Sequence, residues 1–198
     1  MSLRRRVIVV LLAALVFGAV AALLKGQGSG VNQVLGNMSA PWLMVAFLAG
    51  TRSRSLRVGG ALGLAATLMA LSGFYVAFAL SADLGDHGLA GDLYLTLSGY
   101  NSRYFLAGLV SGPALGAIGA WWNVRRSAPA SVGIGLLLLC EPLAIALISN
   151  VGLLARLAGG WAESDPRPYV GEFVLGLAVL AAGYLIRQLR HDAAATSI

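Results

Sequence analysis

One glutamate lies deep within an apolar stretch of this sequence. Glu141 stands directly before Pro142, near the middle of the apolar segment 130–150. A charge at that depth in a membrane costs at least about 2.5 kcal/mol and is normally kept only where it faces protein or water. We therefore expect Glu141 to face inward, with Ser72 and Tyr75 as hydrogen-bond partners. Two interpretations stay open. Glu141 is either a structural carboxylic acid that bonds to the backbone group left without a hydrogen bond by Pro142, or a group linked to protons or to a substrate.

A second set of polar side chains gathers around the expected outer ends of the helices. Glu172 lies just inside an apolar segment, where Arg103 is a candidate ion-pair partner, and the Gly-rich segment 25–37 ends at Asn37. These residues predict a polar mouth that binds a small solute, although solvated loop charges are the simpler interpretation. The candidate binding residues are Glu141, Tyr75, Ser72, Asn37, Glu172 and Arg103.

The side chains of common catalytic and metal chemistry are scattered along the sequence. Both histidines, His87 and His191, fall outside the apolar segments, as does every aspartate. No intramembrane zinc site, Ser-His dyad or aspartyl pair can therefore be assembled. Glu141 and Glu172 lie at different expected depths, so we do not expect them to meet. A single cysteine, Cys140, excludes a disulfide framework. We expect no catalytic residue, no enzyme activity, no metal and no cofactor.

The elements that position these residues are apolar helices. Hydrophobic residues make up 58% of the chain and charged residues 11%, against about 25% charged residues in a soluble domain. About 20 helical residues cross a hydrocarbon core about 30 Å thick. The sequence predicts an all-α membrane protein, with one transmembrane domain over 1–198 and a short second helix. The expected helices cover residues 7–24, 38–50, 58–82, 104–124, 130–150 and 170–186.

The distribution of basic residues predicts sidedness. Ten of the fourteen Lys and Arg residues lie before the first segment, in alternate loops, or after the last segment. Basic residues near helix ends are retained in the cytoplasm, so both termini are expected there. Charge confined to helix ends indicates topology and attraction to anionic lipid, and argues against nucleic-acid binding. The preference for Arg over Lys, with abundant Ala and Gly, indicates a GC-rich bacterial genome and hence a bacterial plasma membrane.

Small residues recur every four positions on two of the expected helices. Such ridges allow helix backbones to approach closely in lipid. They indicate either packing within the chain or docking of another membrane protein or a second copy, and both remain open. The docking candidates are Ala14, Gly18, Ala22, Gly108, Gly112 and Gly116.

Three stretches of the sequence resemble a family of known sequences: NMSAPW at 37–42, FLAG at 47–50 and the Arg-rich turn that follows. That family is an uncharacterised bacterial family of small six-helix integral membrane proteins, and the likeness covers most of the chain. More distantly, the architecture is similar to the substrate-binding components of energy-coupling-factor transporters. That likeness implies a docking motif on the first helix, which here is Ala14, Gly18 and Ala22, with Gly at its centre. No vitamin-pocket residue can be matched.

Two functions fit these observations. The first is a solute-binding or transport-associated membrane subunit with an outward-facing polar pocket. The second is a non-transporting assembly or accessory subunit that docks a membrane partner through its small-residue faces. A pocket lined by Asn37, Tyr75 and Glu141 favours the first, and a closed bundle with an exposed small-residue face favours the second.

Overall fold

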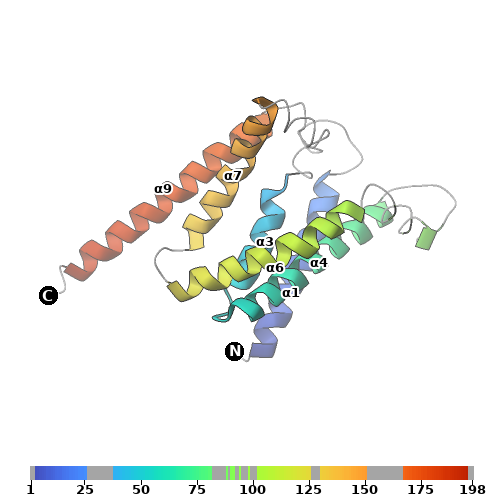
Figure 1. Ribbon diagram of the computed structural model, residues 1–198, viewed down its shortest axis with the longest axis horizontal. Helices are drawn as coiled ribbons and strands as arrows, with labels where there is room; N and C mark the ends of the chain where they lie inside the picture. Colours follow the sequence, from blue (N-terminus) through green and yellow to red (C-terminus); the bar gives the residue numbers. More distant parts are fainter. Residues whose placement is uncertain are drawn as a thin grey trace. The chain divides into compact units, whose positions relative to one another are not determined.

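The computed structural model describes residues 3–25, 38–81, 102–125, 130–150 and 167–195, together with positions 88, 90, 91, 94 and 98. This part of the chain contains six helices and no strand, which confirms the all-α prediction for it. The helices are α1 (Leu3–Lys25), α3 (Ala40–Gly50), α4 (Leu56–Ser81), α6 (Ser102–Arg125), α7 (Ala130–Asn150) and α9 (Arg167–Ala195) (Figure 1).

Four of these helices are long and apolar enough to cross a membrane. Their apolar stretches are Arg5–Lys25, Leu56–Ser81, Tyr104–Arg125 and Arg167–Leu189. Large apolar side chains cover the outward face of α1, among them Leu12, Val16 and Leu23. Water would penalise such a surface, whereas lipid tails accept it. The lengths and the exposed surface together indicate a membrane-embedded protein.

The two remaining helices are shorter apolar elements. The 11 residues of α3 span about 16 Å, about half of a hydrocarbon core, so the expected shortness of the second helix is confirmed. Pro41 lies in the first turn of α3, where its missing N–H costs nothing. The apolar part of α7 covers Ser131–Leu147.

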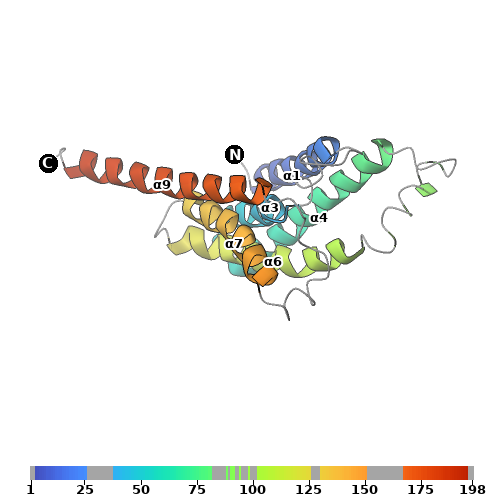
Figure 2. The ribbon, with the colours of Figure 1, turned by 90° about the horizontal axis from the view of Figure 1, so that it is seen from above.

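The chain divides into two compact units, Met1–Arg125 and Arg126–Ile198, and each is described by itself. In unit 1, α4 contacts α1, α3 and α6, and α3 also contacts α6. In unit 2, α7 packs against α9 (Figure 2). The single transmembrane domain expected over 1–198 stays a prediction.

The α4–α6 contact in unit 1 is a seam of glycines. A Cβ at Gly63 would lie 2.6 Å from the Cα of Gly116, and a Cβ at Gly59 would lie 2.7 Å from the carbonyl oxygen of Gly116. Further along, Gly108 faces the side chains of Thr67 and Leu71. The numbering rises along α4 as it falls along α6, so the two helices run antiparallel.

The α1–α4 contact also brings glycines against backbone. The two helices run parallel, because Ala14 of α1 packs with Ala66 and Ala70 of α4, whereas Ala22, further along α1, packs with Phe74 and Tyr75, further along α4. Gly18 of α1 lies against the carbonyl group of Ala70, and Gly73 of α4 lies against the carbonyl group of Leu15. Lipid tails provide no hydrophobic drive between helices, so this close backbone approach supplies the packing. The directions of α1, α4 and α6 match the alternating crossings expected from the sequence.

The two ends of unit 1 differ in character. At one end lies an aromatic cluster, in which the ring centroids of Trp42 are 5.4 Å from those of both Phe17 and Phe74. Tyr75 lies between Phe74 and Phe105, with centroids 5.3 Å from each. These edge-to-face and offset contacts join all four helices of the unit.

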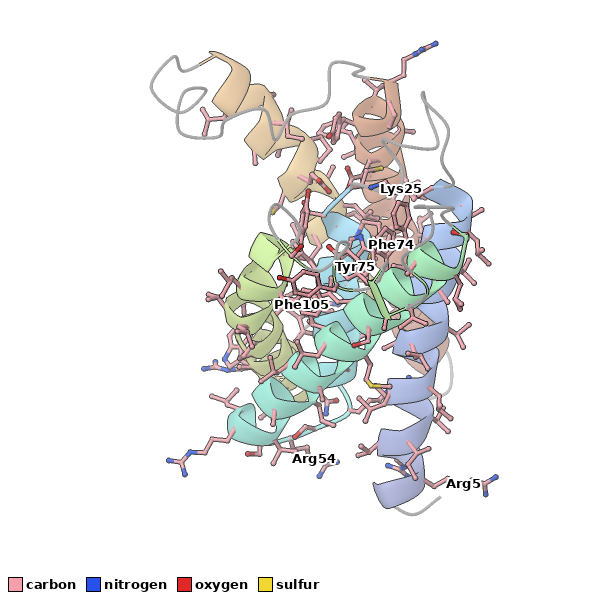
Figure 3. The ribbon with its side chains drawn as sticks, turned by 90° about the vertical axis from the view of Figure 1, so that its right-hand side faces the viewer. Arg5, Lys25, Arg54, Phe74, Tyr75 and Phe105 are labelled. Carbon is pink, nitrogen blue, oxygen red and sulfur yellow. The ribbon has the colours of Figure 1, made fainter. Side chains whose placement is uncertain are left out.

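The other end of unit 1 carries exposed arginines and no acidic residue in its described helices. Figure 3 shows Arg5 and Arg54 at this end and Lys25 beside Phe74 at the opposite one. Asn123 of α6 donates a hydrogen bond of 3.0 Å to the carbonyl oxygen of Ser53, which fixes the turn between α3 and α4 against the end of α6. The exposed arginines are called the basic rim: Arg5, Arg6, Arg52, Arg54, Arg57 and Arg125.

Candidate binding site: a buried acid pair

Small residues set the register between α7 and α9 in unit 2. A Cβ at Gly135 would lie 3.1 Å from the carbonyl oxygen of Gly176, and a Cβ at Gly176 would lie 3.1 Å from that of Gly135. Nearer the start of α7, a Cβ at Gly183 would lie 2.8 Å from the hydroxyl oxygen of Ser131. The helices are therefore antiparallel, with backbones in close contact.

The same register brings two carboxyl groups together. Six residues along α7 from Gly135 stands Glu141, and four residues back along α9 from Gly176 stands Glu172. Electrostatic repulsion acts between the two side chains, because Glu141 is the acidic neighbour of Glu172. We call Glu141 and Glu172 the acid pair.

Glu172 is the more enclosed member of the acid pair. Its side chain is 4% exposed, whereas that of Glu141 is half-buried. Within the part of the chain that the structure describes, no N–H or hydroxyl group donates to the carboxyl oxygens of Glu172, and the group that its side chain meets is the carboxyl group of Glu141. Buried polar groups are nearly always hydrogen-bonded, and each exception requires an explanation. For Glu172 the partner is an unusual one, a second carboxyl group.

Positive charge lies only at the ends of this helix pair. No basic residue occurs in α7, and α9 carries Arg167 at its first position and Arg187 and Arg190 near its last turns. Arg167 and Arg187 are both exposed. Between Glu172 and Arg187, fifteen residues of helix span about 22 Å. The acid pair is therefore surrounded by apolar and small residues along the middle of both helices.

Two facing carboxyl groups of this kind have a limited chemistry. Two like charges in contact repel each other, so an arrangement of this kind suits a positively charged or hydrogen-bond-donating ligand. A larger metal site is not formed, because the described residues contain no group of three His, Cys, Asp or Glu side chains.

The expectation that Glu141 and Glu172 do not meet was wrong. It compared depths along two separate segments, and it started the last helix at residue 170, whereas α9 begins at Arg167. Glu172 is then more than a turn inside its helix, and antiparallel packing sets it against the middle of α7. The signal in the sequence that could have shown the contact is the pair of glycines, Gly135 and Gly176. Their close approach fixes which residues of the two segments face each other.

The structure separates the two hydrogen-bond partners expected for Glu141. Tyr75 is buried in the aromatic cluster, while Ser72, three residues earlier on α4, is exposed. Both belong to unit 1, so their pairing with Glu141 in unit 2 stays a prediction. Asn37 lies outside the described residues. Arg103 lies in the first turn of α6, and its side chain lies outside the described part.

The small residues expected to dock a partner are covered within unit 1. Ala14, Gly18 and Ala22 of α1 are buried, and Gly18 lies against α4. On α6, the three glycines lie against Gly59, Gly63, Leu64, Thr67 and Leu71 of α4. Both ridges therefore serve packing within the chain, the first of the two interpretations left open. Docking of a further protein stays a prediction, but these two small-residue faces no longer support it.

Comparison with known proteins bears on the family. Residues 1–197 match the family model described as "Family of unknown function (DUF6518)". No curated protein and no solved structure matches the chain. The likeness to energy-coupling-factor components stays a prediction, while the resemblance to an uncharacterised family is confirmed. The match covers nearly the whole length, so the chain belongs to the family of unknown function DUF6518.

Proposed function

We propose that this chain is a transport-associated subunit of the bacterial plasma membrane and that it binds a small solute at the acid pair. The observation that carries the proposal is Glu172, a buried carboxyl group in the middle of the α7–α9 contact whose side chain meets a second carboxyl group, that of Glu141. In apolar surroundings, burial of two carboxyl groups costs free energy. A bound solute that contacts the two carboxyl groups offsets that cost.

A purely structural role for the acid pair fits less well. A structural carboxylic acid inside a membrane donates to a carbonyl group or pairs with a base. Among the described residues, the group that the side chain of Glu172 meets is instead another acid, Glu141. Methionine or leucine at this position would pack against α7 without any such penalty. Retention of a strained polar group where an apolar one packs better is typical of functional sites.

The distribution of charge supports the proposed sidedness. The basic rim occupies one end of unit 1, and Arg187 and Arg190 lie toward the C-terminal end of α9. Retention of these residues in the cytoplasm would place both termini there. Arg125 lies 5.5 Å from the ring centroid of Trp121, an exposed pair suited to the boundary between lipid headgroups and water.

The proposal is tested by asking what the protein holds after purification. The wild-type protein, Glu141→Gln, Glu172→Gln and the control Cys140→Ser are reconstituted in lipid nanodiscs, and released small molecules and ions are quantified by mass spectrometry. Cys140 is exposed and directly precedes Glu141, so its variant controls for disturbance of α7.

We expect a solute that is present in about one copy with wild type and Cys140→Ser and is depleted with both glutamine variants. Equal solute content in all four proteins would refute the proposal. Circular dichroism and size-exclusion profiles of the glutamine variants must match those of the wild type, so that loss of the solute is not loss of the fold.

A further inference from the structure

We propose that unit 1 binds the phosphate group of an anionic phospholipid at four arginines of the basic rim. They are Arg52 and Arg54 in the turn between α3 and α4, Arg57 in the first turn of α4, and Arg125, the last residue of α6. We call these four residues the turn arginines; the arginines of α1 lie outside this set. The proposal concerns a surface of unit 1 and does not depend on the acid pair of unit 2.

The turn that carries Arg52 and Arg54 is held in one conformation. Between them lies Ser53, which is buried, and its hydroxyl group donates a hydrogen bond of 3.1 Å to the carbonyl oxygen of Ser55. The backbone N–H of Ser55 donates back to the same hydroxyl oxygen at 3.0 Å. Asn123 of α6 donates to the carbonyl oxygen of Ser53 at 3.0 Å. These bonds fix the turn against α6, two residues before the last residue of that helix.

The start of α4 packs against the end of α6 as well. A Cβ at Gly59 would clash with the Cβ of Ala120, so the two helices touch at this level. Arg57 lies two residues before Gly59, and Arg125 lies five residues after Ala120. The backbone positions of all four turn arginines are therefore fixed near one another without a ligand. A site that is organised in advance loses less entropy when it binds.

The charge of the turn arginines calls for an anion. All four side chains are exposed, and none of the residues described in unit 1 is acidic. Like charges held near one another repel, and a bound anion relieves that repulsion. Guanidinium groups suit phosphate in particular, because their planar N–H groups can bond two phosphate oxygens at once.

Apolar side chains beside the turn arginines favour the phosphate of a lipid. Leu56 and Val58 flank Arg57, Val124 precedes Arg125, and each of these three apolar side chains is about half exposed. A free phosphate ion or a nucleic acid backbone offers them no apolar partner. The acyl chains of a phospholipid cover such side chains while its phosphate lies at the arginines.

Trp121 indicates that this surface lies at the level of the lipid headgroups. Its ring is 45% exposed, and the centroid of the ring lies 5.5 Å from the guanidinium carbon of Arg125. Tryptophan concentrates at the boundary between the hydrocarbon core and water. A guanidinium group that stacks on an aromatic ring keeps the N–H groups at its edge available for phosphate oxygens. Figure 3 shows Arg54 at this same end of the unit.

The experiment counts the lipids bound to the full-length protein by native mass spectrometry in mild detergent, during a titration with dioleoylphosphatidylglycerol. The matched lipid is dioleoylphosphatidylcholine, which has the same acyl chains and a headgroup without net charge. Wild type should bind the first phosphatidylglycerol about tenfold more tightly than phosphatidylcholine. Arg54→Gln and Arg125→Gln should each weaken that binding about fivefold, the effect of one basic residue near anionic lipid, and Arg54→Lys should weaken it less.

The control variant is Arg6→Gln, which removes the same charge from an exposed position on α1. It should weaken the binding of phosphatidylglycerol by less than about twofold, because Arg6 lies outside the turn arginines. Size-exclusion and circular dichroism profiles of all variants must match those of the wild type. Excess glycerol phosphate and a single-stranded RNA serve as competitors that carry phosphate without acyl chains.

The outcomes decide between a lipid site and its alternatives. A preference for phosphatidylglycerol that falls in Arg54→Gln and Arg125→Gln, and that persists with both competitors present, supports the proposal. Equal affinity for the two lipids overturns it. Equal losses in Arg6→Gln and Arg54→Gln also overturn it, since they show attraction spread over the whole basic rim. Displacement of the lipid by glycerol phosphate or by RNA overturns the assignment to a phospholipid.

Discussion

Gly63 of α4 and Gly116 of α6 lie so close that neither position has room for a Cβ atom. A Cβ on Gly63 would lie 2.6 Å from the Cα of Gly116, and one on Gly116 would lie 2.8 Å from the Cα of Gly63. The atoms in the way belong to the backbone and cannot move aside as a flexible side chain would. The α4–α6 seam therefore depends on glycine at both positions.

Replacement of Gly116 with alanine is expected to destabilise unit 1 by about 1–3 kcal/mol, the usual cost of overpacking a close contact. Gly171→Ala on α9 is the matched control, because nothing lies within 4 Å of the Cβ it would gain. That variant should be neutral or slightly stabilising, since alanine favours a helix over glycine. Thermal unfolding in mild detergent measures both. Equal stability of the two variants would show that the seam is looser than described.

Replacement of Glu172 with methionine should stabilise the protein while removing its ligand site. Methionine is similar in length and apolar, so the cost of burying a carboxyl group against a second one, about 1–3 kcal/mol, is relieved. The free energy of unfolding, measured by titration with a denaturing detergent in ligand-free buffer, should rise. Glu141→Met should have a smaller effect, because Glu141 is only half-buried. A clear loss of stability in Glu172→Met would mean that the carboxyl group holds the helices together.

Trp42 is expected to be the tryptophan on which unit 1 depends most. Its ring meets Phe17 of α1 and Phe74 of α4 edge-on, so it joins three helices. Trp42→Ala should cost about 3 kcal/mol, the lower end of the range for buried tryptophan, because lipid tails replace part of the lost contact. Trp121 is 45% exposed, so Trp121→Phe should leave thermal unfolding nearly unchanged. Similar losses from both variants would contradict this ranking.

The sequence was sufficient for the helices but not for the acid pair. Apolar length predicted the ends of α1, α3, α4, α6 and α7 to within four residues. The last helix, α9, extends nine residues further than predicted, to Ala195, because its polar end carries no apolar signal. Ridges of small residues predicted close packing, yet not which helix would cover each ridge. Depth along a segment is a coordinate in one dimension, so it could not show that Glu141 faces Glu172. Ser72 shows the same limit of a depth estimate. It lies at a similar depth to Tyr75, but its position around the helix axis places it on the exposed face of α4.

The sidedness of the chain is open to a direct test through α4. Ser55 and Ser81 are both exposed and lie at opposite ends of this helix, about 39 Å apart at 1.5 Å per residue. With Cys140→Ala as a cysteine-free background, Ser55→Cys and Ser81→Cys each introduce one thiol. If the basic rim lies in the cytoplasm, a membrane-impermeant maleimide should label Ser81→Cys in intact cells and leave Ser55→Cys unlabelled.

Permeabilised cells provide the control for this labelling, because both thiols should then react to a similar extent. Ser55 follows the arginines of the turn between α3 and α4, and its backbone N–H donates to the hydroxyl oxygen of Ser53 at 3.0 Å, so the cysteine replaces only an exposed side chain. Labelling of Ser55→Cys alone in intact cells would invert the proposed topology. Labelling of both thiols without permeabilisation would show that α4 does not cross the membrane, because an impermeant reagent reaches only one end of a crossing helix. The arginines at the Ser55 end would then not indicate the cytoplasmic side.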